Sequence, residues 1–262
     1  MYKNHFIYPY FGNKRTEAAY IIENIKDSLL KCDTIVEPYC GSSAISYHIS
    51  LLYPKKFKYI LNDNDKQLIN LYNLVKDEKE LDKLIIKLND ISKDINKEKY
   101  NLLKKDENTK LENFLYIRMI YQIRPNLFPT EKEQKRIKKD FSYIKDLPII
   151  KFLKNEDVEI YNNDGIDILE KYNNNEKNLI ILDPPYLMSD NLSYYSDIKR
   201  KRNIYEYLFN NDIKKMNASI ILILEKIWII ELLFNNCIND EYEKKYFNQN
   251  KRKTKHIIIK NK

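Results

Sequence analysis

Glycine is unusually scarce in this chain, which has 262 residues but only three glycines, Gly12, Gly41 and Gly165. So few glycines exclude the dinucleotide-binding fingerprint, which needs three of them close together, and no Gly-Lys-Ser or Gly-Lys-Thr phosphate loop is present. Each glycine falls at an expected strand end or loop, where the lack of a side chain permits a positive φ or the close approach of a ligand. We expect ligand contacts there; the alternative is three ordinary turns.

Cysteine is equally rare. Cys32, Cys40 and Cys237 show no paired spacing, which argues against a disulfide framework and against a zinc site, so no metal is expected. A reducing, intracellular setting fits this best, whether cytoplasm, nucleoid or a viral compartment.

Long uncharged apolar runs are also missing. Residues 218–234 are the most apolar stretch, but Glu225, Lys226 and Glu231 interrupt it well short of a membrane span. The first residues contain no continuous apolar segment of the kind that opens a signal peptide, so secretion is not expected. A hydrophobic content of 43% is nevertheless enough to build a folded core.

Positive charge is in excess, with a net charge of +8, which suits a polyanionic partner because neutralised phosphates release counterions. The alternative for each basic group is solvated charge on a helix face. The groups are Lys135, Arg136, Lys138 and Lys139; Lys199, Arg200, Lys201 and Arg202; and Lys251, Arg252, Lys253 and Lys255.

Short apolar runs alternate with longer segments of helical periodicity. The runs predict buried strands at 34–36, 59–61, 158–161, 179–182 and 219–224, and the periodic segments predict helices at 16–30, 44–52, 66–75 and 227–234. Such alternation predicts an α/β fold with a mostly parallel sheet, helices on both faces and ligands at the carboxyl ends of the strands.

Residues 76–145 break this alternation. They are rich in charged residues and Asn, with Leu and Ile at helical intervals, and predict a helical insertion. We expect a catalytic domain over 1–75 and 146–262, and a target-recognition role for the insertion; the alternative is a stabilising appendage. The residues that favour recognition are Arg118, Arg124, Asn126 and the basic group that begins at Lys135.

Two strand ends carry cofactor signals. Gly41 lies in a small-residue turn between a strand and a helix, where backbone amides can approach a ligand. About twenty residues later Asp63 ends the next strand, the place where an acid commonly accepts hydrogen bonds from ribose hydroxyls. Together they predict a cofactor that contains adenosine.

The tetrapeptide Asp183-Pro184-Pro185-Tyr186 follows the apolar run 179–182. Its prolines fix φ and remove amide donors, which leaves the Asp183 carboxylate and the Pro184 carbonyl as acceptors facing one small space. Two convergent acceptors suit an amino group with two hydrogens, and Tyr186 offers a flat face for stacking a base. The alternative is a proline-stiffened strand exit with a surface carboxylate.

The order of the segments resembles that of the Dam family of DNA adenine methyltransferases, in the alpha group of amino-methyltransferases. The matching segments are Tyr10-Phe11-Gly12-Asn13-Lys14, Glu37-Pro38-Tyr39-Cys40-Gly41-Ser42-Ser43, Asn62-Asp63-Asn64-Asp65, Asn163-Asp164-Gly165 and Asp183-Pro184-Pro185-Tyr186.

This resemblance implies a Rossmann-like methyltransferase fold and methyl transfer from S-adenosylmethionine to the exocyclic 6-amino group of adenine in DNA. By resemblance, the cofactor contacts Tyr10, Gly12, Asn13, Lys14, Glu37, Pro38, Tyr39, Cys40, Gly41, Ser42, Ser43, Asp63, Asn64, Asp164, Gly165 and Asp183. The catalytic residues are Asp183, Pro184, Pro185 and Tyr186. A base within double-stranded DNA cannot reach such a pocket, so we expect its extrusion, with Tyr186 stacking on it and Tyr194 and Tyr195 closing over the site. The chain itself is expected to be a monomer or a weak homodimer.

The chain also departs from the family pattern. Asn13 and Ser43 replace glycines, which their small size is expected to allow; 114–129 lacks the internal glycines of a family segment; and 252–259 resembles the closing strand without its usual Glu. Three alternatives stay open: methylation of RNA adenine, methylation of the amino group of DNA cytosine, and a non-catalytic methyltransferase-like subunit that binds nucleic acid. A basic helical insertion does not distinguish duplex DNA from structured RNA.

Overall fold

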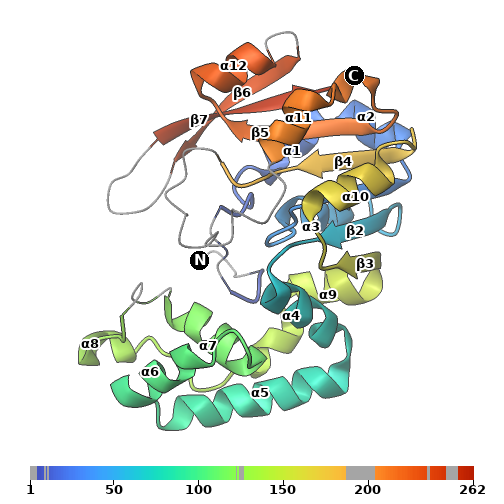
Figure 1. The fold of residues 1–262 in the computed structure, drawn as a ribbon. Helices are drawn as coiled ribbons and strands as arrows, with labels where there is room; N and C mark the ends of the chain where they lie inside the picture. The colour runs from blue at the N-terminus through green and yellow to red at the C-terminus, as the bar shows by residue number, and fades with distance from the viewer. Residues whose placement is uncertain are drawn as a thin grey trace. The chain divides into compact units, whose positions relative to one another are not determined.

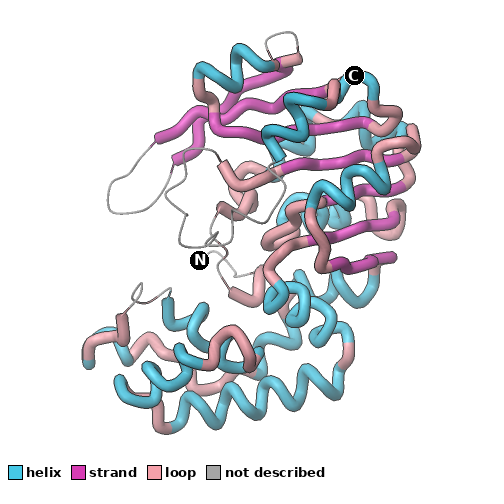
Figure 2. The backbone as a smooth tube through the Cα atoms, in the orientation of Figure 1, coloured by secondary structure: helices cyan, strands magenta, loops and turns pink. Residues whose placement is uncertain are grey.

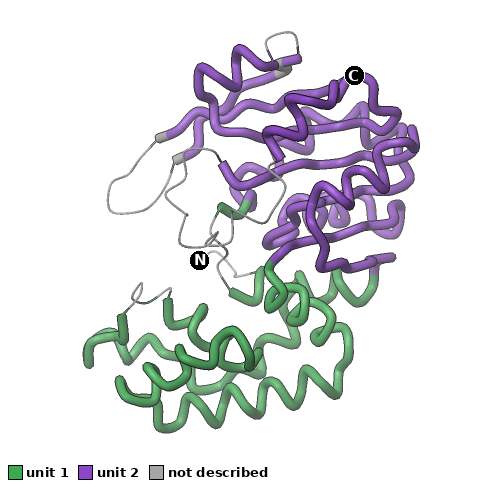
Figure 3. Tube along the Cα trace, viewed as in Figure 1, with its two compact units in different colours: residues 1–13, 65–155 green, residues 14–64, 156–262 purple. Residues whose placement is uncertain are grey.

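A computed structural model describes residues 5–8, 10, 12–121, 123, 127–186, 204–234, 237–245 and 253–262. The chain divides into two compact units, each built from two stretches of sequence (Figure 3). We call Met1–Asn13 with Asp65–Asn155 the helical unit, and Lys14–Asn64 with Glu156–Lys262 the sheet unit.

The sheet unit contains, in its described part, one seven-stranded sheet of order β3-β2-β1-β4-β5-β7-β6 (Figures 1 and 2). Its strands are β1 (Thr34–Glu37), β2 (Lys58–Asn62), β3 (Asp157–Tyr161), β4 (Asn178–Leu182), β5 (Ser219–Glu225), β6 (Ile238–Lys245) and β7 (Lys253–Lys260). β1 to β5 pair in parallel, whereas β7 is antiparallel to both β5 and β6. The strand order reverses between β1 and β4, because the chain moves outward from β1 through β2 and β3 before it returns to β4.

Helices cover both faces of this sheet. Ile180 and Leu182 of β4 pack into one apolar cluster with Ile166 and Leu169, whereas Leu179 and Ile181, also buried, alternate with them and so point to the opposite face. Figure 1 shows α10 and α11 in front of the sheet, and α1, α2 and α3 behind it. The helices are α1 (Ala18–Asn24), α2 (Lys26–Lys31), α3 (Ala44–Leu52), α10 (Gly165–Tyr172), α11 (Ile204–Asn210), η4 (Ile213–Lys215) and α12 (Trp228–Leu233).

The helical unit is built on its own apolar core. Leu81, Leu84, Ile85 and Leu88 of α5 are buried, as their spacing predicts. Asp77 begins this helix by accepting hydrogen bonds from the amides of Lys79 and Glu80. Its helices are α4 (Lys66–Lys76), α5 (Glu78–Lys93), α6 (Lys97–Lys105), α7 (Leu111–Tyr121), α8 (Glu131–Gln134), η1 (Ser142–Asp146) and α9 (Pro148–Asn155).

The mostly parallel α/β fold predicted from the sequence is confirmed, and each of the five predicted strands corresponds to one of β1 to β5. The helix predicted over 16–30 is wrong in one respect, because Ile25, at φ −104° and ψ 10°, separates α1 from α2. Among the described residues no helix is both long enough and apolar enough to cross a membrane.

Candidate active site

Three acidic residues lie at the carboxyl ends of neighbouring parallel strands. Glu37 ends β1, Asp63 follows β2, and Asp183 follows β4. β1 and β4 are the two strands between which the strand order reverses, and in open α/β sheets ligands bind in the crevice at this point. Glu37 and Asp183 therefore stand on either side of the position where a ligand is expected.

Asp183 is held by a lysine and a tyrosine. The Lys14 ammonium forms an ion pair with Oδ2 of Asp183, and the Lys14 side chain is only 4% exposed. The Tyr186 hydroxyl lies 3.2 Å from Oδ1 of the same carboxylate, and Lys14 Nζ lies 5.2 Å from the centre of the Tyr186 ring. The three side chains thus form one cluster around the Asp183 carboxylate.

The proline segment has a further support from α11. Tyr205 donates a hydrogen bond of 3.0 Å to the carbonyl oxygen of Pro185. This contact fixes the chain immediately after Pro184, and it was not foreseen from the sequence, because Tyr205 is one of 22 tyrosines and follows no motif.

The loop between β1 and α3 turns through two left-handed residues. Gly41 has φ +46° and Ser43 has φ +54°, so Ser43 adopts the backbone conformation for which glycine is favoured. Before the loop, the buried Glu37 carboxylate accepts hydrogen bonds from the amide of Ser46, at 2.9 Å, and from its hydroxyl. Glu37 therefore anchors the start of α3. Within the loop, Pro38, Cys40 and Ser42 are buried and Tyr39 is partly buried.

Glu37 is held in an environment that opposes its charge. Burial raises its pKa to about 7, and the nearby Asp183 carboxylate acts in the same direction, whereas the Ser46 hydrogen bonds and Lys14 lower it. The sequence identified this residue only as part of a resemblance; its partner Ser46 was missed because no short motif connects the two.

Asp63 and Asn62 connect the three strand ends. Asp63 Oδ2 accepts a hydrogen bond of 2.9 Å from the Gly41 amide. The Asn62 side chain, fully buried, donates to the carbonyl oxygens of Pro38 at 2.8 Å and Asn163 at 3.1 Å, and accepts from the Asn163 amide at 2.9 Å. Asn62 therefore fixes the loops after β1 and β3 relative to each other. Asn64, next along the chain, is exposed.

Gly165 lies against Tyr39 of the loop between β1 and α3. A Cβ atom built at Gly165 would lie 2.4 Å from a ring carbon of Tyr39, so any side chain there must displace that ring. Asp164 accepts a hydrogen bond of 2.8 Å from the Ile166 amide and so begins α10.

Three of the predicted cofactor residues belong to the helical unit. They are Tyr10, Gly12 and Asn13. The side-chain amide of Asn13 donates a hydrogen bond of 2.8 Å to the carbonyl oxygen of Tyr10. Gly12 has φ +76°, and a Cβ atom built on it would meet no atom within 4 Å. Lys14, the next residue, already belongs to the sheet unit.

The described basic residues differ in their surroundings. Lys135 and Arg136 are exposed. Lys138 lies 3.4 Å from the centre of the Tyr143 ring, Lys139 donates a hydrogen bond of 2.6 Å to the Ser92 carbonyl oxygen, and Arg118 lies 5.2 Å from the centre of the Phe114 ring. Lys253 begins β7. The other predicted nucleic-acid contacts lie outside the described residues: Arg124, Asn126, Tyr194, Tyr195, Lys199, Arg200, Lys201, Arg202, Lys251 and Arg252.

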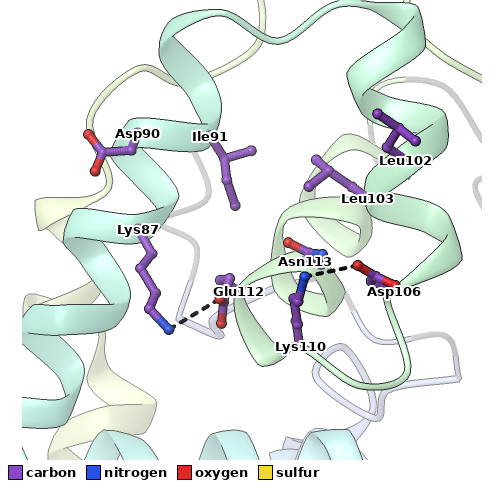
Figure 4. A pocket seen from close by; sticks show the side chains of 9 residues that line it. All are labelled: Lys87, Asp90, Ile91, Leu102, Leu103, Asp106, Lys110, Glu112 and Asn113. Carbon is purple, nitrogen blue, oxygen red and sulfur yellow. Dashed lines mark hydrogen bonds and ion pairs between the residues drawn. The ribbon is translucent and has the colours of Figure 1, made fainter.

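The helical unit also contains a cavity of about 450 Å³ (Figure 4). Ion pairs from Lys87 to Glu112, at 3.1 Å, and from Lys110 to Asp106, at 2.9 Å, lie along it. None of its lining residues belongs to the segments that carry the resemblance, so the cavity is not part of the candidate site. Among the described residues, no group of three or more His, Cys, Asp or Glu side chains could hold a metal ion.

A Rossmann-like sheet with an Asp-Pro-Pro-Tyr segment after β4, at the strand-order reversal, defines the class of amino-methyltransferases. The model of the D12 class N6 adenine-specific DNA methyltransferase family matches residues 10–248, and the chain belongs to this family. It is therefore an enzyme that methylates adenine in DNA, and its family implies S-adenosylmethionine as the methyl donor. Family membership favours this activity over the RNA, cytosine and non-catalytic alternatives. A comparison with curated proteins finds no significant match.

Proposed function

We propose that the carboxyl ends of β1, β2 and β4 form the active site, where Asp183, Pro184 and Tyr186 receive an adenine extruded from duplex DNA. The observation that carries this proposal is the position of Asp183, which follows β4 at the strand-order reversal and contacts both Lys14 and Tyr186. A ligand bound at this point meets the catalytic carboxylate directly.

The residues after β1 and β2 fit S-adenosylmethionine. Gly41 and Ser43 turn the backbone with positive φ in the loop that follows β1. The Asp63 carboxylate, next to Gly41, suits ribose hydroxyls, and Glu37 and Asp183 suit the cationic groups of the cofactor. When bound, the cofactor supplies an electrophilic methyl group.

The Asp183 carboxylate and the Pro184 carbonyl act on the adenine amino group. Its nitrogen is a poor nucleophile because its lone pair is delocalised into the ring. Hydrogen bonds from the amino group to these two acceptors favour a tetrahedral nitrogen and orient its lone pair for the transfer. Lys14 fixes the orientation of the carboxylate through Oδ2, and the Tyr186 ring stacks on the extruded base.

We further propose that residues 76–145 recognise the DNA, with 1–75 and 146–262 as the catalytic domain. Lys135 and Arg136 are exposed and can contact phosphates. The protein acts as a monomer or a weak homodimer in this proposal.

Sequencing of genomic DNA that detects N6-methyladenine, from a host expressing the chain, tests this function. Wild type is expected to introduce the base, and Asp183→Ala to abolish it while calorimetry still detects S-adenosylmethionine binding. Asp94→Ala removes an exposed carboxylate of the helical unit and serves as the control. Full methylation by Asp183→Ala would overturn the proposed mechanism.

A further inference from the structure

His256 of β7 is buried against the catalytic tyrosine. It is 0% exposed, and the centre of its ring lies 5.1 Å from that of Tyr186 at an interplanar angle of 88°, which is an edge-to-face contact. The contact joins the last strand of the chain to the segment after β4. The active-site roles described above do not include this histidine.

Both ring nitrogens of His256 have hydroxyl partners. Nδ1 lies 3.3 Å from the Tyr186 hydroxyl and 3.4 Å from that of Tyr242, and Nε2 lies 3.2 Å from Oγ1 of Thr254. A phenol is a better hydrogen-bond donor than acceptor, so two phenols facing Nδ1 favour a lone pair there. The proton then sits on Nε2, which donates to Thr254.

The ring is also kept neutral. Burial lowers the pKa of His256 to about 3, and the positive charges of Lys14 and Lys244 act in the same direction. A neutral ring with its single lone pair on Nδ1 can accept a hydrogen bond from Tyr186 or from Tyr242.

Tyr186 has one hydroxyl proton, and the described residues place two acceptors near it, Asp183 Oδ1 at 3.2 Å and His256 Nδ1 at 3.3 Å. Lys14 already pairs with Oδ2 of Asp183. While Tyr186 donates to Oδ1, both carboxylate oxygens have a donor, and an incoming amino group can use only the lone pairs that remain on them. Donation to His256 instead leaves Oδ1 to the amino group.

We propose that His256 is a positioning residue for the methylation site. It holds the Tyr186 ring edge-to-face, and its Nδ1 accepts the hydrogen bond of the Tyr186 hydroxyl when an adenine amino group donates to Asp183 Oδ1. This inference rests on the proposed function. His256 acts through Tyr186. The last two strands, β6 and β7, therefore contribute to the methylation site through Tyr242, Thr254 and His256.

Nitrogen-15 NMR of the histidine rings tests the contact without DNA or cofactor. The chain has three histidines, so His5→Gln and His48→Gln assign the signals. At pH 7 we expect a His256 ring protonated on Nε2, whose Nδ1 signal shifts in Tyr186→Phe but not in Tyr59→Phe, a buried tyrosine of β2. A proton on Nδ1, or no response to Tyr186→Phe, would overturn the proposal.

Single-turnover methylation of unmethylated genomic DNA tests the role. His256→Phe keeps an aromatic ring but removes the acceptor, and is expected to slow methyl transfer at least tenfold while the KM for S-adenosylmethionine changes less than twofold. His256→Asn retains an acceptor near the Nδ1 position and should recover more of the rate than His256→Gln, which places its amide near Nε2. Ile258→Val, two residues along the same strand, controls for a loss of packing.

The double variant His256→Phe with Tyr186→Phe completes a cycle. If His256 acts through the Tyr186 hydroxyl, the double variant is no slower than the slower single variant. Multiplied effects would contradict the coupling. If the wild-type protein methylated no DNA, both the proposed function and the role of His256 in the reaction would be refuted. If the wild type were active and His256→Phe methylated at the same rate, only the inference about His256 would be refuted.

Discussion

Lys14 and Asp183 lie 169 positions apart in the sequence and form an ion pair whose lysine is almost completely buried. A buried cation is stable only when it is paired, and removal of one partner leaves the other charge uncompensated. The Asp183 carboxylate and the Lys14 ammonium therefore depend on each other. This relationship explains why a lysine close to the start of the chain accompanies a motif after β4.

Lys14→Met is expected to slow methyl transfer at least tenfold, because the carboxylate loses the contact that orients it. Arginine is longer and planar, so Lys14→Arg should not restore the rate fully. Single-turnover methylation of genomic DNA measures the effect. Lys26→Met, which removes an exposed lysine of α2, is the control. An unchanged rate in Lys14→Met would show that Asp183 needs no orienting partner.

Asp63→Ala should weaken S-adenosylmethionine binding about tenfold and leave the rate at saturating cofactor close to that of wild type. The variant removes the acceptor of the Gly41 amide together with the proposed ribose contact. Isothermal titration calorimetry gives the affinity. Asp33→Ala removes an exposed carboxylate at the opposite end of β1 and should bind the cofactor normally. Unchanged affinity in Asp63→Ala would mean that the ribose contact is misassigned.

The parallel part of the fold could be predicted because its signals are local. The apolar runs of β1 to β5 end at turns and acids, and each marks its own position in the sequence. β6, Ile238–Lys245, was not predicted, since Asn-Asp-Glu-Tyr-Glu-Lys-Lys carries neither an apolar run nor clear alternation. It forms because β7 pairs with it, a relationship that no local pattern contains.

The candidate site divides in the same way. Asp183 and Gly41 belong to contiguous motifs and could be selected from the sequence. Tyr205 and His256 contribute single side chains from distant elements, and only the folded chain brings them to the motifs. Ser46 is close in sequence, but its contact with Glu37 depends on how the loop turns into α3. The missing Glu of the closing strand was recognised as a departure, but the sequence did not indicate that His256 contacts Tyr186.

Ser43→Gly should raise the free energy of unfolding by about 1 kcal/mol, because Ser43 holds a left-handed backbone that costs a non-glycine residue roughly 1–2 kcal/mol, partly offset by the greater freedom of glycine in the unfolded chain. Urea denaturation measures the change. Ser42→Gly, at a buried neighbour outside the left-handed region, should lower stability instead. Equal effects of the two substitutions would show that the left-handed backbone of Ser43 does not destabilise the folded chain.

Glu37→Gln should gain stability relative to wild type as the pH rises from 5 to 8. The pKa of Glu37 is raised from 4.5 to about 7, so the folded chain favours the protonated carboxyl. The contribution of this carboxyl to the free energy of unfolding is therefore fully present below pH 4.5 and is lost as the pH rises through 7. Gln cannot ionise and keeps its stability over this range. The variant therefore gains at most on the order of 3 kcal/mol in free energy of unfolding relative to wild type.

His256 opposes this trend in wild type. Its pKa is lowered to about 3, so its contribution to the free energy of unfolding is fully present above pH 6.5 and is lost as the pH falls toward 3. The difference between wild type and Glu37→Gln, obtained from urea unfolding at several pH values, removes this common term. Glu176→Gln, which makes the same substitution at an exposed position, is the control. Parallel stability curves for wild type and Glu37→Gln would exclude a raised pKa in the folded chain.

The double variant Lys135→Ala with Arg136→Ala should weaken binding to mixed-sequence duplex DNA and reduce its salt dependence. Each lost phosphate contact lowers the slope of log K against log salt by about 0.9, so two contacts account for a change of about 2. Fluorescence anisotropy at several salt concentrations measures both quantities. Lys79→Ala with Lys83→Ala removes the same charge from α5, where both lysines are exposed, and should leave the slope unchanged. Equal slopes for the two double variants would mean that the charge of the helical unit attracts DNA only as a whole, and that Lys135 and Arg136 are not contact residues.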